Sequence, residues 1–371
     1  MVASTSPPGI ADPAGPATTP GRRRGRLLLL TSGALGAVVL AVVVAGVLVA
    51  GVWSWPSHSY AERPGPVLDL SQRLHVGGTT TPVHGAYDGL TVELQPLSLG
   101  QRLVHDVSGD PATVIPEGAL HPSGESDATY QAVQKSAYVD GAQVAAAVAE
   151  RALGLQVNAT VRGVTVDDVV AHSPAATVLR PGDLITAVDG HPLTSATDLP
   201  NAIRGATGRP VTLLVKRPTA TTSQTVTTTP VPAGPDHTPE LGVLVEPPSV
   251  DVQLPIPVTD DDHGVAGPSA GLMTGLAVYD ELSPLDVAAG RTIAGTGTLD
   301  IDGRVGDIGG IEAKARAAAA AGAQLFLAPA DQADAARKVL GNRIPVIGVD
   351  TFQHALDALH AVATGTGSVV R

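Results

Sequence analysis

The hydrophobic pattern begins with a long uncharged run near the N-terminus. The 27 residues of 27–53 carry no charged side chain, and a cluster of four arginines directly precedes them. About 20 helical residues cross a bilayer, so this run is long enough to span one. Arginines at one end favour a cytoplasmic N-terminus, and Trp53 and Trp55 suit the opposite membrane–water interface. The pattern predicts a single N-terminal transmembrane helix over 27–53, with a disordered cytoplasmic tail over 1–26 and everything beyond it extracytoplasmic.

Two other interpretations of the run stay open. A cleaved signal peptide has an apolar region of about 7–15 residues, which this run exceeds. A buried core helix would also lack charges. We favour the uncleaved anchor, and therefore expect a single-pass protein of the cell membrane with the lipid bilayer as the partner of 27–53.

Beyond a short linker, the pattern changes from strand-like to helix-like and back. Residues 67–125 alternate apolar and polar positions in places, and Ala, Val and Leu recur at three- and four-residue steps over 127–153. We interpret 67–151 as a β-rich region followed by a buried helix. Residues 154–232 form short strands and two short helices. From 241 to 363, strands alternate with helices, which indicates an α/β domain of roughly 120–130 residues.

Composition removes several classes of function. The chain has no cysteine, which excludes disulfides, zinc ribbons and thiol nucleophiles. Its net charge of −12 is opposite to the basic surface of general nucleic-acid binders, so no nucleic-acid partner is expected. None of its four lysines follows a glycine, as the lysine of a P-loop does. We expect no cofactor.

A turn-rich segment resembles a bacterial PDZ domain. Ser-Pro-Ala-Ala at 173–176 and Pro-Gly-Asp-Leu-Ile at 181–185 stand at the spacing of that family. The resemblance covers about 152–232 and implies a mainly β domain with two helices, which binds an extended peptide as an added strand. The helix beside the peptide would run from Ala196 to Arg204, and no Gly-Leu-Gly-Phe-like loop precedes the first strand. A PDZ domain that only packs against its neighbour is the alternative.

Two glycine-flanked motifs in the α/β domain carry candidate chemistry. Ser269 stands in Gly-Pro-Ser-Ala-Gly at the start of a helix, where unpaired N–H groups and the helix dipole stabilise an oxyanion. Lys314 follows Gly309 and Gly310 in the first turn of another helix. A cation is unfavourable there, and this position together with burial lowers a lysine pKa toward the roughly 7–8 of general bases. A neutral lysine can take the proton of a serine without a histidine.

These motifs resemble those of the Lon-type serine–lysine proteases. The sequence around Ser269 matches the nucleophile motif, Gly-Gly-Ile-x-x-Lys ending at Lys314 matches the lysine motif, and Thr296-Gly297 lies between them. This resemblance covers about 238–363, and the whole chain resembles the bacterial PDZ-containing Lon-like membrane proteases. It implies an α/β proteolytic domain in which Ser269 is the catalytic nucleophile, Lys314 is the general base, and Thr296 is a supporting hydroxyl that orients the lysine.

The resemblance also implies a function. It is that of an ATP-independent serine endopeptidase that cleaves exposed segments of extracytoplasmic proteins, with the PDZ domain recruiting or gating the substrate. A hexameric homo-oligomer is a further expectation from the family. Two features depart from Lon: Ala266 stands where Lon proteases often carry aspartate, and the ATPase module is not recognised.

Three competing interpretations stay open. The first is a membrane-tethered PDZ adaptor with an inactive protease-like domain. The second is an α/β-hydrolase, because Gly-x-Ser-x-Gly fits a nucleophile elbow, although only about 100 residues follow Ser269 and the rest of such a sheet needs more. The third is a metal site at the acidic run 260–263. Consecutive acids are typical of a solvated turn, so we expect no bound metal.

Overall fold

The computed structural model describes residues 23–365 with the exception of 79, 121–126, 196, 207, 219, 234–236, 246–248 and 262–264; the side chains of 23–38, 127–130, 132 and 133 are also not described. By their contacts the residues form two compact units. One contains 1–57 and 98–108, and the other contains 58–97 and 109–371.

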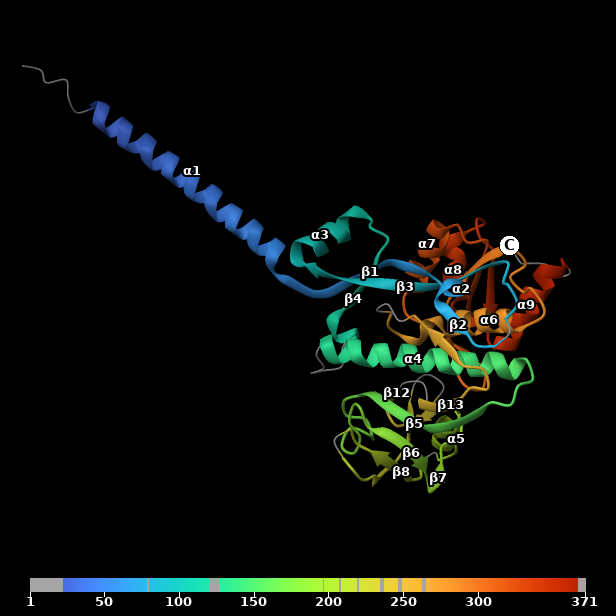
Figure 1. The fold of residues 1–371 in the computed structure, drawn as a ribbon. Coiled ribbons are helices and arrows are strands. Elements are labelled where there is room, and N and C mark those ends of the chain that lie inside the picture. The colour runs from blue at the N-terminus through green and yellow to red at the C-terminus, as the bar shows by residue number, and fades with distance from the viewer. Residues whose placement is uncertain are drawn as a thin grey trace, which may run out of the picture. The chain divides into compact units, whose positions relative to one another are not determined.

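The first unit consists of two helices, α1 (Arg23–Ser54) and α3 (Leu99–Ser108), which are labelled in Figure 1. The ring of Trp53 lies against Gly100, where an added Cβ would come within 2.9 Å of the indole. The N–H of Leu99 donates to the carbonyl of Trp55 at 2.9 Å. Glycine at position 100 therefore allows the two helices to approach closely.

The expected transmembrane segment 27–53 falls within α1, which begins at Arg23. The side chains of 23–38, and almost all of the expected tail over 1–26, lie outside the described residues. In the part of the chain that is described, no helix has the combination of length and apolar character that crossing a bilayer requires.

The second unit contains a six-stranded sheet built from distant parts of the chain. Its order is β19–β18–β15–β3–β1–β4. The strands are β1 (Pro56–Asp69), β3 (Gly85–Ser98), β4 (Thr113–Pro116), β15 (Arg291–Gly295), β18 (Leu325–Pro329) and β19 (Val346–Val349). β15 pairs in parallel with both β3 and β18, and β18 pairs in parallel with β19.

The strands expected as a β-rich region of their own are therefore part of the α/β domain. β15 is largely buried, and a buried strand needs a partner along each edge to satisfy its backbone hydrogen bonds. β18 supplies one edge and β3 the other. Two short pairs complete this part of the unit, β2 (Leu74–Val76) with β14 (Val258–Asp260), and β16 (Thr298–Leu299) with β17 (Val305–Gly306).

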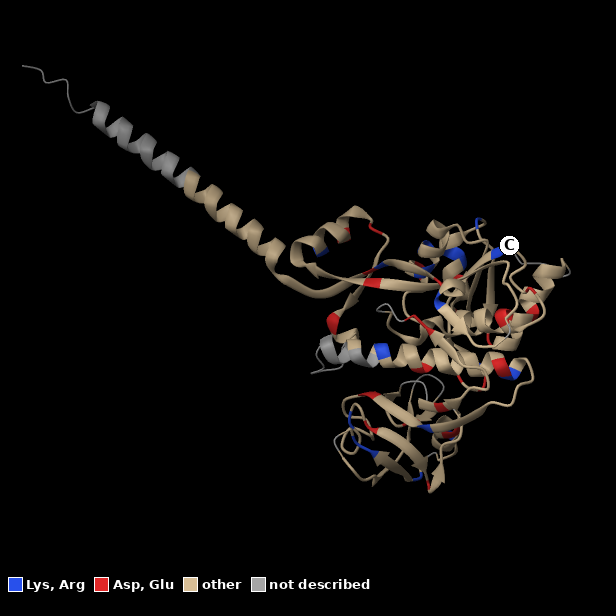
Figure 2. Cartoon of the chain, in the orientation of Figure 1, with Lys and Arg blue, Asp and Glu red and all other residues tan. Residues whose placement is uncertain are grey.

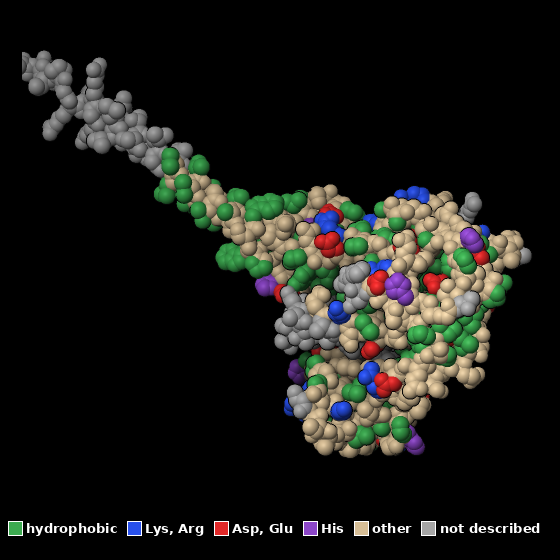
Figure 3. Space-filling view, viewed as in Figure 1, with side chains coloured by type: hydrophobic (Ala, Val, Ile, Leu, Met, Phe, Trp, Pro, Cys, Tyr) green, Lys and Arg blue, Asp and Glu red, His purple; other side chains and the backbone are tan. Residues whose placement is uncertain are grey.

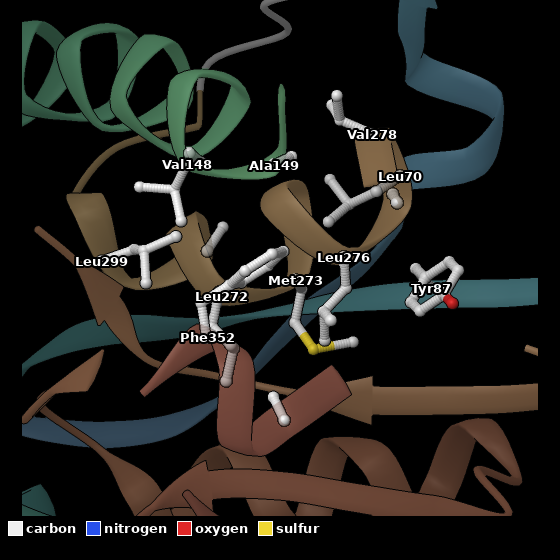
Figure 4. Packing of buried hydrophobic residues seen from close by; sticks show 14 of the residues in the cluster. Leu70, Tyr87, Val148, Ala149, Leu272, Met273, Leu276, Val278, Leu299 and Phe352 are labelled. Carbon is white, nitrogen blue, oxygen red and sulfur yellow. The ribbon is translucent and has the colours of Figure 1, made fainter. Parts of the chain in front are cut away.

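Helices cover both faces of the sheet. Alternate residues of a strand point to opposite faces: Ile293 joins a core with residues of α4 (Asp127–Ala152), α6 (Gly271–Leu282) and α9 (Phe352–Thr364), whereas Ala294 joins a core with α7 (Ile311–Ala321) and α8 (Ala333–Leu340). In Figure 4, Val148 of α4 and Phe352 of α9 converge on Leu272 of α6. The α/β domain thus has three layers.

The PDZ-like segment forms a separate sheet. Its order is β12–β5–β6–β8–β9, with β13 also on β5 and β7 on β6. The strands are β5 (Asn158–Val169), β6 (Leu184–Val188), β7 (His191–Pro192), β8 (Val211–Lys216), β9 (Gln224–Thr228), β12 (Val243–Val245) and β13 (Ser249–Gln253). Leu199 and Ile203 of α5 (Asp198–Gly205) pack on its core. A further short pair, β10 (Val231–Ala233) with β11 (Thr238–Glu240), follows this sheet in the chain.

Two expectations for this segment are wrong. Two helices were expected, but the described residues of the segment form only α5. The Ser-Pro-Ala-Ala stretch is a series of turns, because the two prolines Pro174 and Pro181 leave too few residues between them for a stable helix. The strand at 241–245 was assigned to the α/β domain, but β12 pairs with β5 of the PDZ-like sheet and forms its edge.

Candidate active site

Ser269 lies in a single 3-10 turn, η2 (Pro268–Ala270), that leads directly into α6. Gly267 enters this turn with φ +88°, a conformation that favours glycine. On the opposite side, the turn packs against α4, where a Cβ added to Gly141 would lie 3.3 Å from the Pro268 side chain. Small residues thus hold the serine at the start of a buried helix, and its own side chain remains partly exposed.

Lys314 lies in the first turn of α7. The helix begins after Gly310, whose left-handed φ of +71° again favours glycine, and the N–H of Lys314 donates to the Gly310 carbonyl at 2.9 Å. Alanines make up most of the helix and support it by their high helix propensity. The lysine is only 2% exposed, so its side chain points into the interior.

The structure brings the three predicted site residues together. Lys314 Nζ lies 2.8 Å from Ser269 Oγ and 3.2 Å from Thr296 Oγ1. Thr296, which is fully buried after the end of β15, donates from Oγ1 to the Ser269 carbonyl at 3.1 Å. Because its proton is used in that bond, the threonine oxygen faces the lysine as an acceptor.

Comparison with known proteins identifies two domains in the chain. Residues 249–359 match the Lon protease (S16) C-terminal proteolytic domain, and residues 165–217 match the PDZ domain. The chain combines a PDZ domain with a Lon-type proteolytic domain. Lon protease 2 of Bacillus subtilis is 32% identical over 95 residues, which are 26% of this chain and 17% of that protein, so the match spans less than a fifth of this relative.

Solved PDZ domains also resemble the chain. The PDZ domain of an SdrC-like protein from Listeria monocytogenes is 29% identical and covers 23% of this chain and 90% of its own, with a TM-score of 0.22. Its counterpart from Listeria innocua is 28% identical and covers 22% of this chain and 92% of its own, with a TM-score of 0.21.

The lysine of the Lon-type domain has a lowered pKa. Burial disfavours the charged ammonium and lowers the pKa of Lys314 to about 8, against the opposing effect of the Glu62 carboxylate. Both the helix dipole and burial were expected to lower this pKa, and burial is the largest cause. A lysine of this kind is neutral in about half of the molecules at pH 8, which makes it able to accept a proton.

Glu62 is a residue of the site that the sequence argument missed. It belongs to β1, is 6% exposed, and lies so close to the start of α7 that a Cβ added to Gly310 would come within 2.5 Å of its Oε1. Burial raises the pKa of Glu62, and Lys314 and Arg316 oppose that increase. Nothing in the local sequence marks it, because only the pairing of the sheet brings β1 near α7.

Glu62 also changes the interpretation of Ala266. This alanine, at the position where Lon proteases often carry aspartate, is exposed and has no polar group to offer the lysine. A carboxyl group is nevertheless present on the lysine side of the site, supplied by β1. The electrostatic environment of Lys314 therefore depends on a strand some 250 residues earlier in the chain.

The turn at Ser269 provides candidate donors for an oxyanion. The first N–H groups of a helix have no partner inside it, so those of Ser269 and Ala270 suit this purpose. The N–H of Gly267 donates instead to the carbonyl of Gln134 in α4, at 2.8 Å. A carbonyl oxygen that binds here would therefore meet the N–H groups of the helix start.

The acidic run 260–263 lies elsewhere in the same unit. Asp262 and His263 are outside the described residues. The expected solvated turn is wrong for Asp260, which ends β14: its buried carboxylate accepts from the Tyr138 hydroxyl and pairs with Arg73 at 3.4 Å. Among the residues whose positions are described, no group of three or more His, Asp or Glu side chains could hold a metal ion.

The PDZ domain contains a second candidate site, at its edge strand. β12 follows Leu241, which is buried, and Gly242, which has φ +72°. Leu244 and Val245 of this strand are exposed. A ligand-binding loop was sought before the first strand of the domain, whereas β12 comes near the end of the domain, after β9.

Proposed function

We propose that this chain is a membrane-anchored serine endopeptidase in which Lys314 activates Ser269. The observation that carries the proposal is the 2.8 Å separation of Lys314 Nζ and Ser269 Oγ in a site that excludes most water from the amine. This distance allows direct proton transfer, and the lowered lysine pKa makes the neutral amine accessible near physiological pH.

The reaction proceeds in two halves. Neutral Lys314 accepts the Ser269 proton while Oγ bonds to the carbonyl carbon of the substrate, and the electron pair of the carbonyl moves onto its oxygen. The ammonium then gives that proton to the leaving nitrogen as the C–N bond breaks, which leaves an acyl ester on Ser269. In the second half, water takes the place of the serine: Lys314 accepts its proton and returns it to Oγ as the ester breaks.

Thr296 is a positioning residue in this mechanism. Its Oγ1 accepts from Lys314 Nζ and donates to the carbonyl of Ser269. The N–H of Gly297 donates to the same carbonyl at 2.9 Å. Base and nucleophile are thus held by one short segment after β15.

The membrane anchor is supported by the sequence and by the exposed part of α1. No charge occurs in 27–53, and the described part of α1 carries none, as its tan colour in Figure 2 shows. Its valines, leucines and Trp53 are exposed to a degree that is unusual for a protein in water. We assign the bilayer as their surroundings. Because the arginine cluster that precedes the run favours the cytoplasmic side, this anchor leaves the proteolytic domain outside the cytoplasm.

The PDZ domain recruits substrate in this proposal. An extended peptide would add to the free edge of β12, since that strand ends the sheet and exposes Leu244 and Val245. The Leu241-Gly242 turn before β12 would then receive the end of the peptide.

Neither hydrolysis nor recruitment requires ATP, because no lysine of the sequence lies in a P-loop pattern. We further propose a homo-oligomer, a hexamer by resemblance, whose mass can be measured in detergent.

The decisive experiment compares the full chain with Ser269→Ala and Lys314→Arg on an unstructured protein substrate without ATP. We expect both variants to lose cleavage, because arginine stays protonated in proteins and cannot act as a base. A fluorophosphonate probe should label the unaltered chain at Ser269 only. Absence of labelling and cleavage in the unaltered chain would favour the other candidate, a membrane-tethered adaptor whose protease-like domain is inactive.

A further inference from the structure

The helix α3 carries four large apolar side chains that remain exposed in the described chain. Leu99, Leu103, Val104 and Val107 are all exposed, Leu103 to 61% and Val107 to 76%. Their spacing places them along one side of a helix. Arg102 and Asp106 pair with each other at 3.0 Å and border these residues at the edge next to Leu99. We call the four apolar residues the α3 stripe.

The α3 stripe continues the apolar surface of α1. Gly100 lies within the arc that the stripe covers, and the Trp53 ring packs on it. Trp53 and Trp55 are themselves exposed and stand where the uncharged run ends. In Figure 3, hydrophobic side chains (green) cover the described part of α1 and continue toward α3.

Single exposed apolar residues are common, but four of them on a ten-residue helix form an amphipathic surface. Short amphipathic helices with large aliphatic residues on one side and charges on the other bind in the plane of a membrane interface. Tryptophan prefers that same depth. The two tryptophans therefore mark the level of the bilayer at which α3 begins.

We propose that α3 lies on the outer surface of the membrane, with the α3 stripe in the boundary between headgroups and acyl chains. The inference rests on the membrane anchor proposed above. The occupant is lipid, because the stripe is continuous with the tryptophans at the end of the anchor. The Arg102–Asp106 pair, at the border of the stripe, reaches the headgroups and water. The segment between β3 and β4 thereby gives the chain a second attachment to the bilayer.

The chain has no cysteine, so a single introduced cysteine can be labelled selectively. The full chain would be reconstituted into phosphatidylcholine–phosphatidylglycerol vesicles and labelled with an environment-sensitive fluorophore at Leu103→Cys, Val107→Cys or, as matched control, Arg102→Cys. We expect labels at 103 and 107 to emit at shorter wavelength and to be quenched several-fold more by doxyl lipid than the label at 102. Iodide in the water should quench the label at 102 more strongly.

Two outcomes would overturn the proposal. Equal iodide quenching at all three positions would mean that the stripe faces water, and a blue shift without quenching by doxyl lipid would mean that protein covers it. A fourth label at Leu40→Cys in α1 separates this failure from that of the anchor. Lipid quenching at 40 but not at 103 rejects only the position of α3, whereas no lipid quenching at either position rejects the anchor as well. Cleavage of a small peptide by each labelled chain verifies its fold.

Discussion

The side chain of Thr296 donates a hydrogen bond to the main-chain carbonyl of Ser269, at 3.1 Å. The resemblance to Lon proteases assigned this threonine to the lysine alone. The structure gives it contacts with both halves of the dyad, since the same oxygen lies 3.2 Å from Lys314 Nζ. Its removal should therefore disturb the orientation of the base and the loop of the nucleophile together.

Thr296→Val tests this double role. Valine has a similar shape but neither donates nor accepts, so each lost hydrogen bond costs about 1 kcal/mol. We expect kcat to fall by about tenfold or more, with a smaller change in KM. Thr296→Ser keeps the hydroxyl and should restore most of the activity. Equal activity of the valine and serine variants in a peptide-cleavage assay would show that the hydroxyl has no role.

The pH dependence of cleavage should report the titration of Lys314. The base must be neutral, so kcat/KM should rise with pH up to about 8, the pKa to which burial lowers this lysine, and level off above it. Measurement over pH 6 to 10 with a neutral peptide substrate checks this expectation. A flat profile across that range would exclude a titrating lysine base.

Glu62→Gln should move that profile. The Glu62 carboxylate raises the pKa of Lys314, so its loss lowers the pKa and shifts the rising limb to lower pH. Glu312→Gln is the matched control, because Glu312 is on the same helix as Lys314 but is exposed and pairs with Arg316 at 3.6 Å. We expect a clear shift for Glu62→Gln and little or none for Glu312→Gln. A shift toward higher pH in Glu62→Gln would contradict the electrostatic role.

Lys314→Met should inactivate the enzyme and also stabilise it. The folded state holds this lysine at a pKa of about 8, against 10.5 for the free side chain, so below pH 8 its burial costs about 3 kcal/mol. Methionine removes that cost, so the free energy of unfolding should rise at pH 7. The gain should shrink as pH increases from 8 to 10.5, because the lysine is then neutral in both states. Denaturant titrations at pH 7 and pH 10 measure both values, and a lower stability of Lys314→Met at pH 7 would refute the argument.

Gly310→Ala should destabilise the protein more than a glycine-to-alanine replacement at another left-handed position. A Cβ at position 310 meets Glu62 Oε1 and Val92 Cγ1, each at 2.5 Å, in addition to the strain of a left-handed φ. Gly322→Ala, at the other end of α7, has a φ of +79° but no atom within 4 Å of the added Cβ. The control should cost about 1 kcal/mol from backbone strain alone. Thermal unfolding compares the stability of the two variants. An equal loss of stability would mean that the Glu62 side chain moves away from the added Cβ without an energetic cost.

The secondary-structure elements that the sequence predicts correctly are those defined by neighbouring residues in the chain. The alanine-rich helix α7 was expected over 311–321 and has those bounds, because a left-handed glycine lies at each end and alanine favours the helix between them. The hydrophobic pattern alone did not predict the short strands β15, β16 and β17. Their few residues carry no strong period, and they exist only because neighbouring strands pair with them.

The sequence by itself determined which residues could do the chemistry: a serine at a helix start, a lysine in another first turn, and a threonine between them. Their meeting at 2.8 and 3.2 Å was decided by the tertiary structure, since parallel pairing of β15 and β18 brings segments from across the domain to one place. Burial, which lowers the lysine pKa, is likewise a property of the packed interior. The contribution of Glu62 has the same origin, because β1 reaches α7 only through the completed sheet.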